Sequence, residues 1–251
     1  MSTKPLLTVR KLSKTYARRL WWGGMGPRVA ALDRVSFTLD AGSTLAVVGP
    51  SGSGKSTLAR CLAGLDSPTE GEVVFNGDRL EIQLIPQQPA ASLNPRFTAA
   101  AIIEEPLVIQ RRGTPASRRQ KVASALELVG LAPDEMDKRS DRFSGGEKQR
   151  LAIARALMVE PKLFILDESL TGLDAGLQAQ IAALLKELQS RLGVAFILIS
   201  HDLDLAAAMA DEIAVMERGR IVEQAPAGQL AAAPRHPLTV QLLTAAKALS
   251  V

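Results

Sequence analysis

The stretch that decides the fold is Val47-Val48-Gly49-Pro50-Ser51-Gly52-Ser53-Gly54-Lys55-Ser56-Thr57. It matches the pattern G-x-x-x-x-G-K-[ST] at every fixed position, from Gly49 to Ser56. Residues 44–48 before it are predicted to form a buried strand, and residues 58–65 after it a helix with apolar positions at helical spacing. This strand, loop and helix order distinguishes the stretch from an ordinary glycine turn and predicts a site for a polyphosphate.

The residue types of the loop suit a nucleotide. Glycines let the backbone wrap closely around phosphates and point its amide groups inward. Lys55 would neutralise charge on the terminal phosphates, and the hydroxyl of Ser56 would bind Mg²⁺. The positive end of the following helix dipole adds to the attraction. The loop therefore predicts nucleotide binding with Mg²⁺.

Composition excludes several other classes of protein. The chain has 251 residues, 47% hydrophobic and 22% charged, with a net charge of +4, which is typical of a globular chain. An aromatic content of 4% argues against a base-stacking surface, and the basic residues at 118–121 are interpreted as a solvated helix face. Cys61 is the only cysteine, which excludes disulfides within the chain and cysteine metal clusters.

The amino-terminal residues and the hydropathy pattern bear on localisation. Residues 1–10 lack the apolar run of a signal peptide, and no stretch of about 18 apolar residues could span a bilayer. We therefore expect a cytosolic chain that reaches a membrane only through a partner.

A second candidate anion site opens a later helix. Ser144 is well placed to cap the helix predicted over 145–157, and Gly145 and Gly146 leave backbone amides open to an incoming anion. A plainly capped helix would not need two glycines, so an anion site is favoured.

Charged and polar side chains also follow two buried strands. The apolar run 163–166 leads into Asp167 and Glu168, which suit Mg²⁺ binding and water activation. The apolar run 194–199 ends just before His201. Because ligands collect at the carboxyl ends of strands in open α/β sheets, these side chains are predicted to lie near the phosphates.

The remaining pattern predicts alternating strands and helices and therefore an α/β core with a mainly parallel sheet. Helices are predicted over 98–110 and 115–129, a closing hairpin over 213–222 and a helical tail over 226–251. Asn76-Gly77 predicts a hairpin turn. The segment 17–30, with Trp21 and Trp22, is predicted to be an exposed loop.

With these motifs in this order, the chain resembles the ATP-binding cassette subunits of ABC transporters over essentially its whole length. The resemblance implies a P-loop NTPase (RecA-like) core with a mainly parallel sheet, an antiparallel β subdomain and an inserted α-helical subdomain. Within a single ATPase domain, residues 1–86 and 160–225 would form the core with the β subdomain, residues 87–159 the helical subdomain and residues 226–251 the helical tail. The implied ligands are ATP and Mg²⁺.

The resemblance also implies a role for each motif. Glu168 would be the general base for the attacking water, His201 the switch histidine and Gln87 the Q-loop glutamine. Tyr16 would stack on adenine, and Mg²⁺ would lie near Ser56, Gln87 and Asp167. The nucleotide would be held by the Walker A loop, the signature (Ser144 to Gln149) and the D-loop, through Gly49, Pro50, Ser51, Gly52, Ser53, Gly54, Lys55, Ser56, Thr57, Ser144, Gly145, Gly146 and Asp174.

The family sandwiches ATP between two cassettes, so the signature of one chain would face the triphosphate held by the other. Residues 90–96 and 236–239 resemble the importers of peptides, nickel and metal-opine chelates. Implied partners are a second, non-identical cassette, two permeases and an extracytoplasmic binding protein, with the chain at the cytoplasmic face of the inner membrane. Cargo remains open among these three classes.

The chain departs from the family pattern at Pro86 and Gln88 beside the Q-loop, and at Ser169-Leu170 where the family has Pro-Thr. Pro86 and Gln88 bear on the stiffness of the Q-loop. Ser169-Leu170 bears on communication between cassettes. Neither departure removes a catalytic residue.

Two alternatives stay open. A DNA-repair or chromosome-associated ATPase would share the cassette, but such proteins insert long coiled coils between the Walker A loop and the signature, and this chain has no heptad run there. The second alternative is a scaffold subunit that binds ATP but hydrolyses it weakly. Glu168 and His201 argue against this alternative, because such subunits often lose those side chains.

Overall fold

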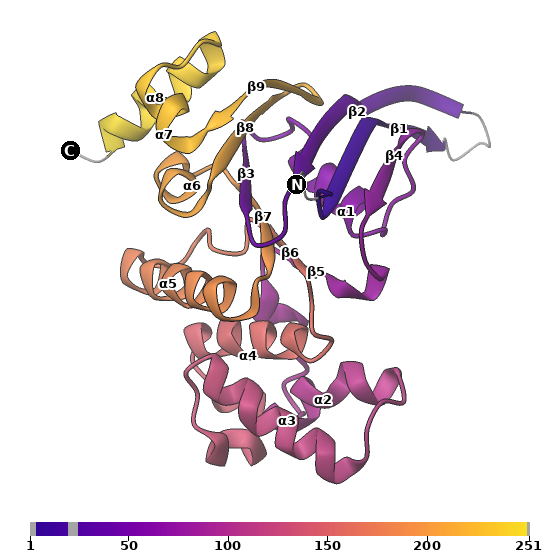
Figure 1. Ribbon diagram of the computed structural model, residues 1–251, viewed down its shortest axis with the longest axis vertical. Coiled ribbons are helices and arrows are strands. Elements are labelled where there is room, and N and C mark those ends of the chain that lie inside the picture. The colour runs from indigo at the N-terminus through magenta and orange to yellow at the C-terminus, as the bar shows by residue number, and fades with distance from the viewer. Residues whose placement is uncertain (1–3, 20–24, 250–251) are drawn as a thin grey trace. The chain divides into compact units, whose positions relative to one another are not determined.

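The computed structural model describes residues 4–19 and 25–249, and the chain divides into two compact units (Figure 1). The first unit is built from residues 1–79 and 195–251, and the second from residues 80–194. The first unit carries the phosphate loop. The second, inserted unit carries the Asp-Glu strand end and the Ser-Gly-Gly helix.

An antiparallel sheet in the first unit has the strand order β2-β1-β4, formed by Met25–Leu39, Leu7–Arg19 and Glu70–Phe75. Along β1, Leu7 and Val9 are buried and Arg10 is exposed, the alternation of a strand with one covered face. A register shift between Val9 and Leu12 adds a residue to the strand, so Leu12 is buried as well.

Two expectations for this region are wrong. Asn76-Gly77 does not close a hairpin, because β4 pairs with β1 whereas the next strand, β5 (Ile82–Ile85), pairs with β6 (Leu163–Asp167). An Asn-Gly pair makes a hairpin turn only where the runs on either side of it pair with each other. The segment 17–30 is largely strand, since β1 extends to Arg19 and β2 starts at Met25. Trp21 and Trp22 lie outside the described residues.

The phosphate loop leaves a parallel sheet in the first unit. Its strand β3 (Thr44–Val48) lies between β7 (Ala195–Ser200) and β8 (Glu212–Glu217), both parallel to it. Every residue of β3 and β7 is buried, as in strands covered on both faces. Helices α1 (Lys55–Leu62) and α6 (Leu203–Met209) pack on these strands. Strand β9 (Arg220–Pro226) pairs antiparallel with β8, which confirms the predicted closing hairpin.

The carboxyl-terminal tail forms two helices, α7 (Ala227–Ala232) and α8 (Pro237–Leu249), beside the β8–β9 hairpin (Figure 1). Glu223 of β9 fixes the start of α8, because its carboxylate accepts hydrogen bonds from the backbone amides of Arg235 and His236, each at 2.9 Å, and from the hydroxyl of Thr239. Burial alone would raise the pKa of Glu223, but these hydrogen bonds outweigh it and the pKa is lowered.

The second unit combines the parallel β5–β6 pair with four helices. The helices are α2 (Ala99–Ile109), α3 (Pro115–Leu128), α4 (Gly145–Leu157) and α5 (Ala175–Leu192). Single 3₁₀ turns cover Arg79–Glu81, Pro89–Ser92, Pro133–Asp137 and Ser140–Arg142. The predicted α/β class, with parallel strands, an antiparallel sheet and a helical insertion, is confirmed. Within the described ranges, we find no helix with the length and apolarity needed to cross a bilayer.

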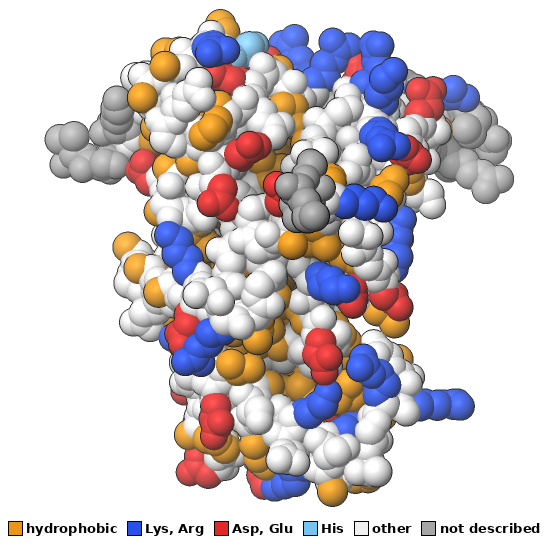
Figure 2. Space-filling model, in the orientation of Figure 1, with side chains coloured by type: hydrophobic (Ala, Val, Ile, Leu, Met, Phe, Trp, Pro, Cys, Tyr) orange, Lys and Arg blue, Asp and Glu red, His pale blue; other side chains and the backbone are white. Residues whose placement is uncertain are grey.

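Basic and acidic side chains are interspersed over the helices of the second unit (Figure 2). The basic run on α3 is ion-paired, since Arg119 lies 2.8 Å from Asp137 and Lys121 lies 2.9 Å from Glu160. The run therefore carries little uncompensated positive charge.

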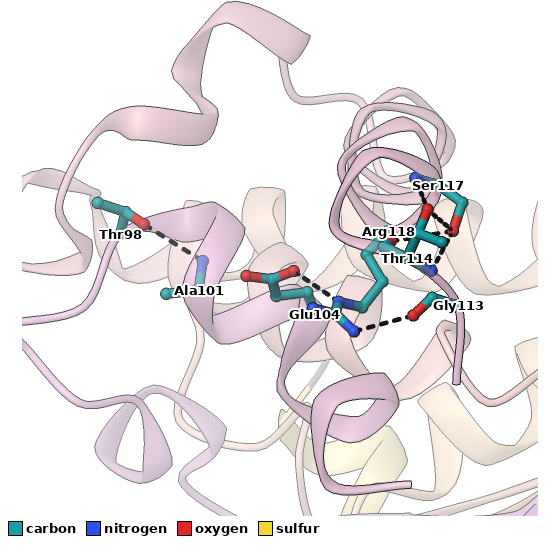
Figure 3. A network of polar contacts seen from close by, with 7 residues as sticks. All are labelled: Thr98, Ala101, Glu104, Gly113, Thr114, Ser117 and Arg118. Atoms are coloured by element: carbon teal, nitrogen blue, oxygen red, sulfur yellow. Dashed lines mark hydrogen bonds and ion pairs between the residues drawn. The ribbon is translucent and has the colours of Figure 1, made fainter. Parts of the chain in front are cut away.

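The start of α3 is tied to α2 by a polar network (Figure 3). Thr114 and Ser117 cap α3 reciprocally, each side chain bonding the backbone amide of the other. Arg118 bridges the two helices, because its Nε lies 3.2 Å from Glu104 of α2 while Nη1 donates to the carbonyl of Gly113. Thr98 caps α2 by accepting from the amide of Ala101.

We predict that Glu223→Ala lowers the free energy of unfolding by about 1 to 3 kcal/mol, because the amides at the start of α8 lose their acceptor. The folded-state pKa of Glu223 lies below its ordinary value of 4.5, so this contribution is present above that pH and is lost as the pH falls below it. Urea unfolding at neutral and acid pH measures both effects. Glu212→Gln is the control, because its amide oxygen can still accept the bond from Gln224; equal losses in the two variants would contradict the assignment.

Candidate functional site

Two positions of the phosphate loop require glycine, because backbone atoms from other segments lie very close to them. A Cβ on Gly49 would lie 2.2 Å from the carbonyl oxygen of Met216, and one on Gly54 would lie 2.3 Å from that of Ala31. Both glycines have positive φ, so any other residue would be strained as well as crowded. Gly52 also has positive φ, yet a Cβ there would meet no atom within 4 Å. The loop is thus packed tightly beneath and open at Gly52.

Lys55 begins α1 and is buried with its amine turned into the loop. Its Nζ donates to the carbonyl oxygens of Gly49 at 2.8 Å and Pro50 at 3.0 Å. These bonds hold a positive charge at the centre of the loop backbone. Gly54 precedes the helix and has no side chain to cap its first amides, and Lys55 is the first residue at this positive end of the helix dipole.

The interior of the loop also holds the hydroxyl of Ser53. In the described part of the chain this Oγ is buried and makes no hydrogen bond. Its backbone is bonded on both sides, to the carbonyl of Pro50 and from the amide of Gly219, so the loop conformation does not depend on the side chain. A buried hydroxyl donor in a loop that also holds a lysine amine fits the oxygen atoms of a polyphosphate.

His201 lies at the edge of the sheet from which the loop emerges. Strands β3 and β7 are parallel and in register, with Val48 opposite Ser200. Gly49 and His201 are therefore the next residues along neighbouring strands. The sequence prediction that this histidine follows a buried strand end is confirmed.

Tyr16 lies on β1 and its phenol is anchored. The hydroxyl donates to Asp66 Oδ2 at 2.7 Å, and the guanidinium of Arg60 contacts the same carboxylate at 2.9 Å. Lys14 Nζ lies over the ring, 5.0 Å from its centroid. One ring face thus meets an ammonium group, and the side chain is partly exposed.

These contacts shift two pKa values in opposite directions. Arg60, and then Tyr16, lower the pKa of Asp66 to about 2, whereas burial and the bond to Asp66 raise the pKa of Tyr16. Because the folded-state pKa of Asp66 lies below 3.8, the network stabilises the fold above that pH and loses the contribution as the pH falls toward 2.

In the second unit the structure brings Gln87 and Glu168 together. The amide Nε2 of Gln87 lies 3.3 Å from Glu168 Oε2, although 81 residues separate the two in sequence. Asp167 is the last residue of buried β6, and Glu168 follows it in the left-handed conformation, with φ of 50°. A carboxylate and an amide thus meet just beyond a buried strand, an arrangement that can bind and orient water.

Ser144 caps α4 in a reciprocal capping box. Its Oγ accepts from the amide of Glu147 at 3.3 Å, and its own amide donates to the Glu147 carboxylate at 2.6 Å, which lowers the pKa of Glu147. The predicted N-cap is confirmed. The Ser144 side chain also hydrogen-bonds the Glu147 carboxylate, which adds to the lowering of that pKa.

The two glycines after Ser144 differ in their surroundings. A Cβ on Gly146 would lie 2.6 Å from the end of the Leu177 side chain of α5, so that side chain would have to shift. A Cβ on Gly145 would meet no atom within 4 Å. Gly145 is therefore the position where internal packing leaves room for a ligand to approach the helix end.

Asp174 has a structural role of its own. It caps α5, with Oδ1 accepting from the amide of Leu177 at 2.9 Å. This bond places Asp174 and the α4 contact residue Leu177 in the same helical turn. The bond to Leu177 alone accounts for an aspartate at this position, so the structure adds no separate support for nucleotide contact.

The donors proposed for Mg²⁺ are all oxygen atoms: the hydroxyl of Ser56, the amide oxygen of Gln87 and the carboxylate of Asp167. Hard oxygen donors fit this ion. Among the residues described, no three histidine, cysteine, aspartate or glutamate side chains gather as a metal-binding cluster. The donor set therefore fits an ion held together with phosphates rather than in a cage made by protein alone.

Sequence reasoning missed Asp66, Arg60 and Thr171. Asp66 meets Tyr16 across 50 residues of sequence, and no local pattern predicts that contact. Thr171 donates through its Oγ1 to the backbone carbonyl of Glu168 at 2.6 Å. A threonine three residues after a strand-end carboxylate could have indicated this turn.

We predict that Asp66→Ala lowers the pKa of Tyr16, because the phenol loses a carboxylate that favours its protonated form. The chain has one tyrosine, so the ultraviolet absorbance of phenolate during an alkaline titration reports this residue alone. Asp40→Ala, which removes a carboxylate elsewhere in the first unit, is expected to leave the titration unchanged. An unaltered Tyr16 pKa in folded Asp66→Ala, verified by circular dichroism, would show that the contact does not persist in solution.

Two solved structures share the fold of this chain. The dimeric, post-hydrolysis structure of the ATP-binding cassette MJ0796 bound to ADP and Pi is 29% identical and superposes with a TM-score of 0.73, covering 88% of this chain and 98% of that one. The cbiO1 structure from Clostridium perfringens, part of the ABC transporter complex cbiONQ, is 26% identical with a TM-score of 0.79, covering 99% and 100% of the two chains.

Sequence comparisons identify the family. The dipeptide transport ATP-binding protein DppF of Haemophilus influenzae is 42% identical over 98% of this chain and 79% of its own length. DppF of Escherichia coli is also 42% identical, over 96% of this chain and 76% of its own length. A family model described as ABC transporter matches residues 32–171. The chain therefore belongs to the ABC transporter family.

Proposed function

We propose that this chain binds and hydrolyses ATP as the energy-supplying subunit of a membrane importer for short peptides. The observation on which this chiefly rests is the buried Lys55 amine, held by loop carbonyls at a glycine-rich strand end. Family membership and the cassette structure bound to ADP and Pi support the same activity.

In this proposal the adenine stacks on Tyr16 and the triphosphate enters the loop. Lys55 exchanges its bonds to the Gly49 and Pro50 carbonyls for bonds to phosphate oxygens, and Ser53 Oγ gains an acceptor. Ser56, Gln87 and Asp167 would hold Mg²⁺, which neutralises phosphate charge when bound. Anchoring of the Tyr16 ring by Asp66 limits the entropy lost on stacking.

In the hydrolysis step we assign the role of general base to Glu168 of the second unit. Glu168 accepts a proton from a water molecule that attacks the terminal phosphorus, and the bond to the bridging oxygen breaks to leave ADP and phosphate. Gln87, in contact with Glu168, orients that water, and His201 hydrogen-bonds the terminal phosphate.

A second cassette completes the site. We propose that the α4 tip of one chain, with the Ser144 hydroxyl and the open backbone at Gly145, meets the triphosphate held by Lys55 of the other. Asp174 is assigned to the same junction. Loss of the terminal phosphate removes the charge that joins the two cassettes, so closure depends on ATP.

The transport assignment rests on the relatives. DppF of two species and several related proteins are named for the transport or import of dipeptides or peptides, so we favour peptides over nickel or metal-opine cargo. We propose two permeases, an extracytoplasmic binding protein and a non-identical second cassette as partners, with this chain peripheral at the cytoplasmic face of the membrane. Copurification of the chain with these subunits tests the assignment.

We predict that Glu168→Gln lowers the ATPase kcat by about 10²- to 10⁴-fold, because the amide cannot accept the proton. Nucleotide binding should persist, and ATP should trap a two-cassette complex visible by size-exclusion chromatography. Turnover is measured in the assembled transporter in lipid, and trapping is measured with the cassette subunits free of the permeases. Glu187→Gln, an exposed carboxylate on α5, is the control and should keep full turnover. Wild-type turnover in Glu168→Gln would contradict the role of the base.

A further inference from the structure

The turn that carries Glu168 has an uncommon backbone conformation. Glu168 has φ of 50°, in the left-handed region, and it is not a glycine. Such a conformation costs about 1 kcal/mol or more and persists only where surrounding contacts hold it. The contacts of residues 168–171 therefore decide where the Glu168 carboxylate lies.

Thr171 holds the turn from within. Its Oγ1 donates to the Glu168 carbonyl at 2.6 Å, and its amide donates to the same oxygen at 3.1 Å. The carbonyl of Glu168 is thus bonded twice by one threonine. Only the hydroxyl bond depends on the side chain, so it can be removed without altering the backbone chemistry.

Gln149 holds the turn from α4. Its side chain is buried, and Nε2 donates to the carbonyl oxygen of Ser169 at 3.0 Å. The Ser169 hydroxyl gives no such support, because in the described residues its buried Oγ makes no hydrogen bond. Thr171 therefore holds the carbonyl of Glu168, and Gln149 holds the carbonyl of Ser169.

We propose that Gln149 and Thr171 are positioning residues for Glu168, which hold its backbone in the left-handed conformation that presents the carboxylate to water. This inference rests on the proposed role of Glu168 as the base. Loss of the donor on either side lets the turn relax toward commoner backbone angles, and the carboxylate moves with it. Displacements of about 1 Å in a reacting group can lower a rate about a hundredfold.

The test compares variants in the assembled transporter. Gln149→Met keeps the size of the side chain and removes its donor, and Thr171→Val does the same for the hydroxyl. Both are expected to lower kcat by about tenfold to a hundredfold while KM for ATP and the affinity for a fluorescent ATP analogue change by less than about twofold. Thr171→Ser, which keeps the hydroxyl, is expected to restore most of the lost kcat.

A structural control separates positioning from general loosening of the fold. Ile153→Val removes one methylene from buried α4 and should lower the melting temperature without lowering kcat. Wild-type kcat in both Gln149→Met and Thr171→Val, or a loss that Ile153→Val shares at an equal melting temperature, would overturn the inference. If Gln149→Met does not fold, the Thr171 pair decides alone. Wild-type turnover in Glu168→Gln would instead defeat the proposed function on which the inference rests.

Discussion

The structure depends most on the close approach of the phosphate loop to the backbone beneath it. Gly49 and Gly54 bring the loop against the carbonyls of Met216 and Ala31 at distances that a Cβ could not occupy. Because the underside of the loop is packed in this way, its carbonyls converge on the Lys55 amine. The same parallel register that ends β3 at this loop ends β7 just before His201. The glycine-rich loop thus places the Lys55 charge at one edge of the sheet, and the register of β3 and β7 places His201 at the same edge.

The inserted unit holds the carboxylate of Glu168 just beyond the end of a buried strand. Buried β6 delivers Asp167 and Glu168 to the end of a strand, and Gln87 contacts the second of them. The helix α4, which starts at the Ser144 cap, also carries Gln149 on its buried side. The candidate site for a partner's triphosphate and a support of the candidate base therefore belong to one helix.

Much of this could be predicted because the signals are local. The phosphate loop, the Ser144 cap and the apolar strands before Asp167 and His201 depend on neighbouring residues, and the structure has each of them. Pairing over long distances could not be predicted. Asn76-Gly77 has the residues of a hairpin turn, but the strands on either side pair elsewhere. The contacts of Tyr16 with Asp66 and of Gln149 with Ser169 depend on how distant segments pack, and no spacing reveals them. The assignment of Gly146 to ligand binding stays a prediction, and the structure adds that a Cβ there would meet the Leu177 side chain.

We propose that ATP joins two cassettes, with the loop around Lys55 of one and the α4 tip of the other on the same triphosphate. Cryo-electron microscopy of the assembled transporter, with hydrolysis blocked and ATP bound, measures this most directly. We predict density for a triphosphate within hydrogen-bonding distance of the Ser144 hydroxyl and of a Walker A lysine from the opposite cassette. A nucleotide-bound assembly in which Ser144 faces solvent, away from every triphosphate, would contradict it.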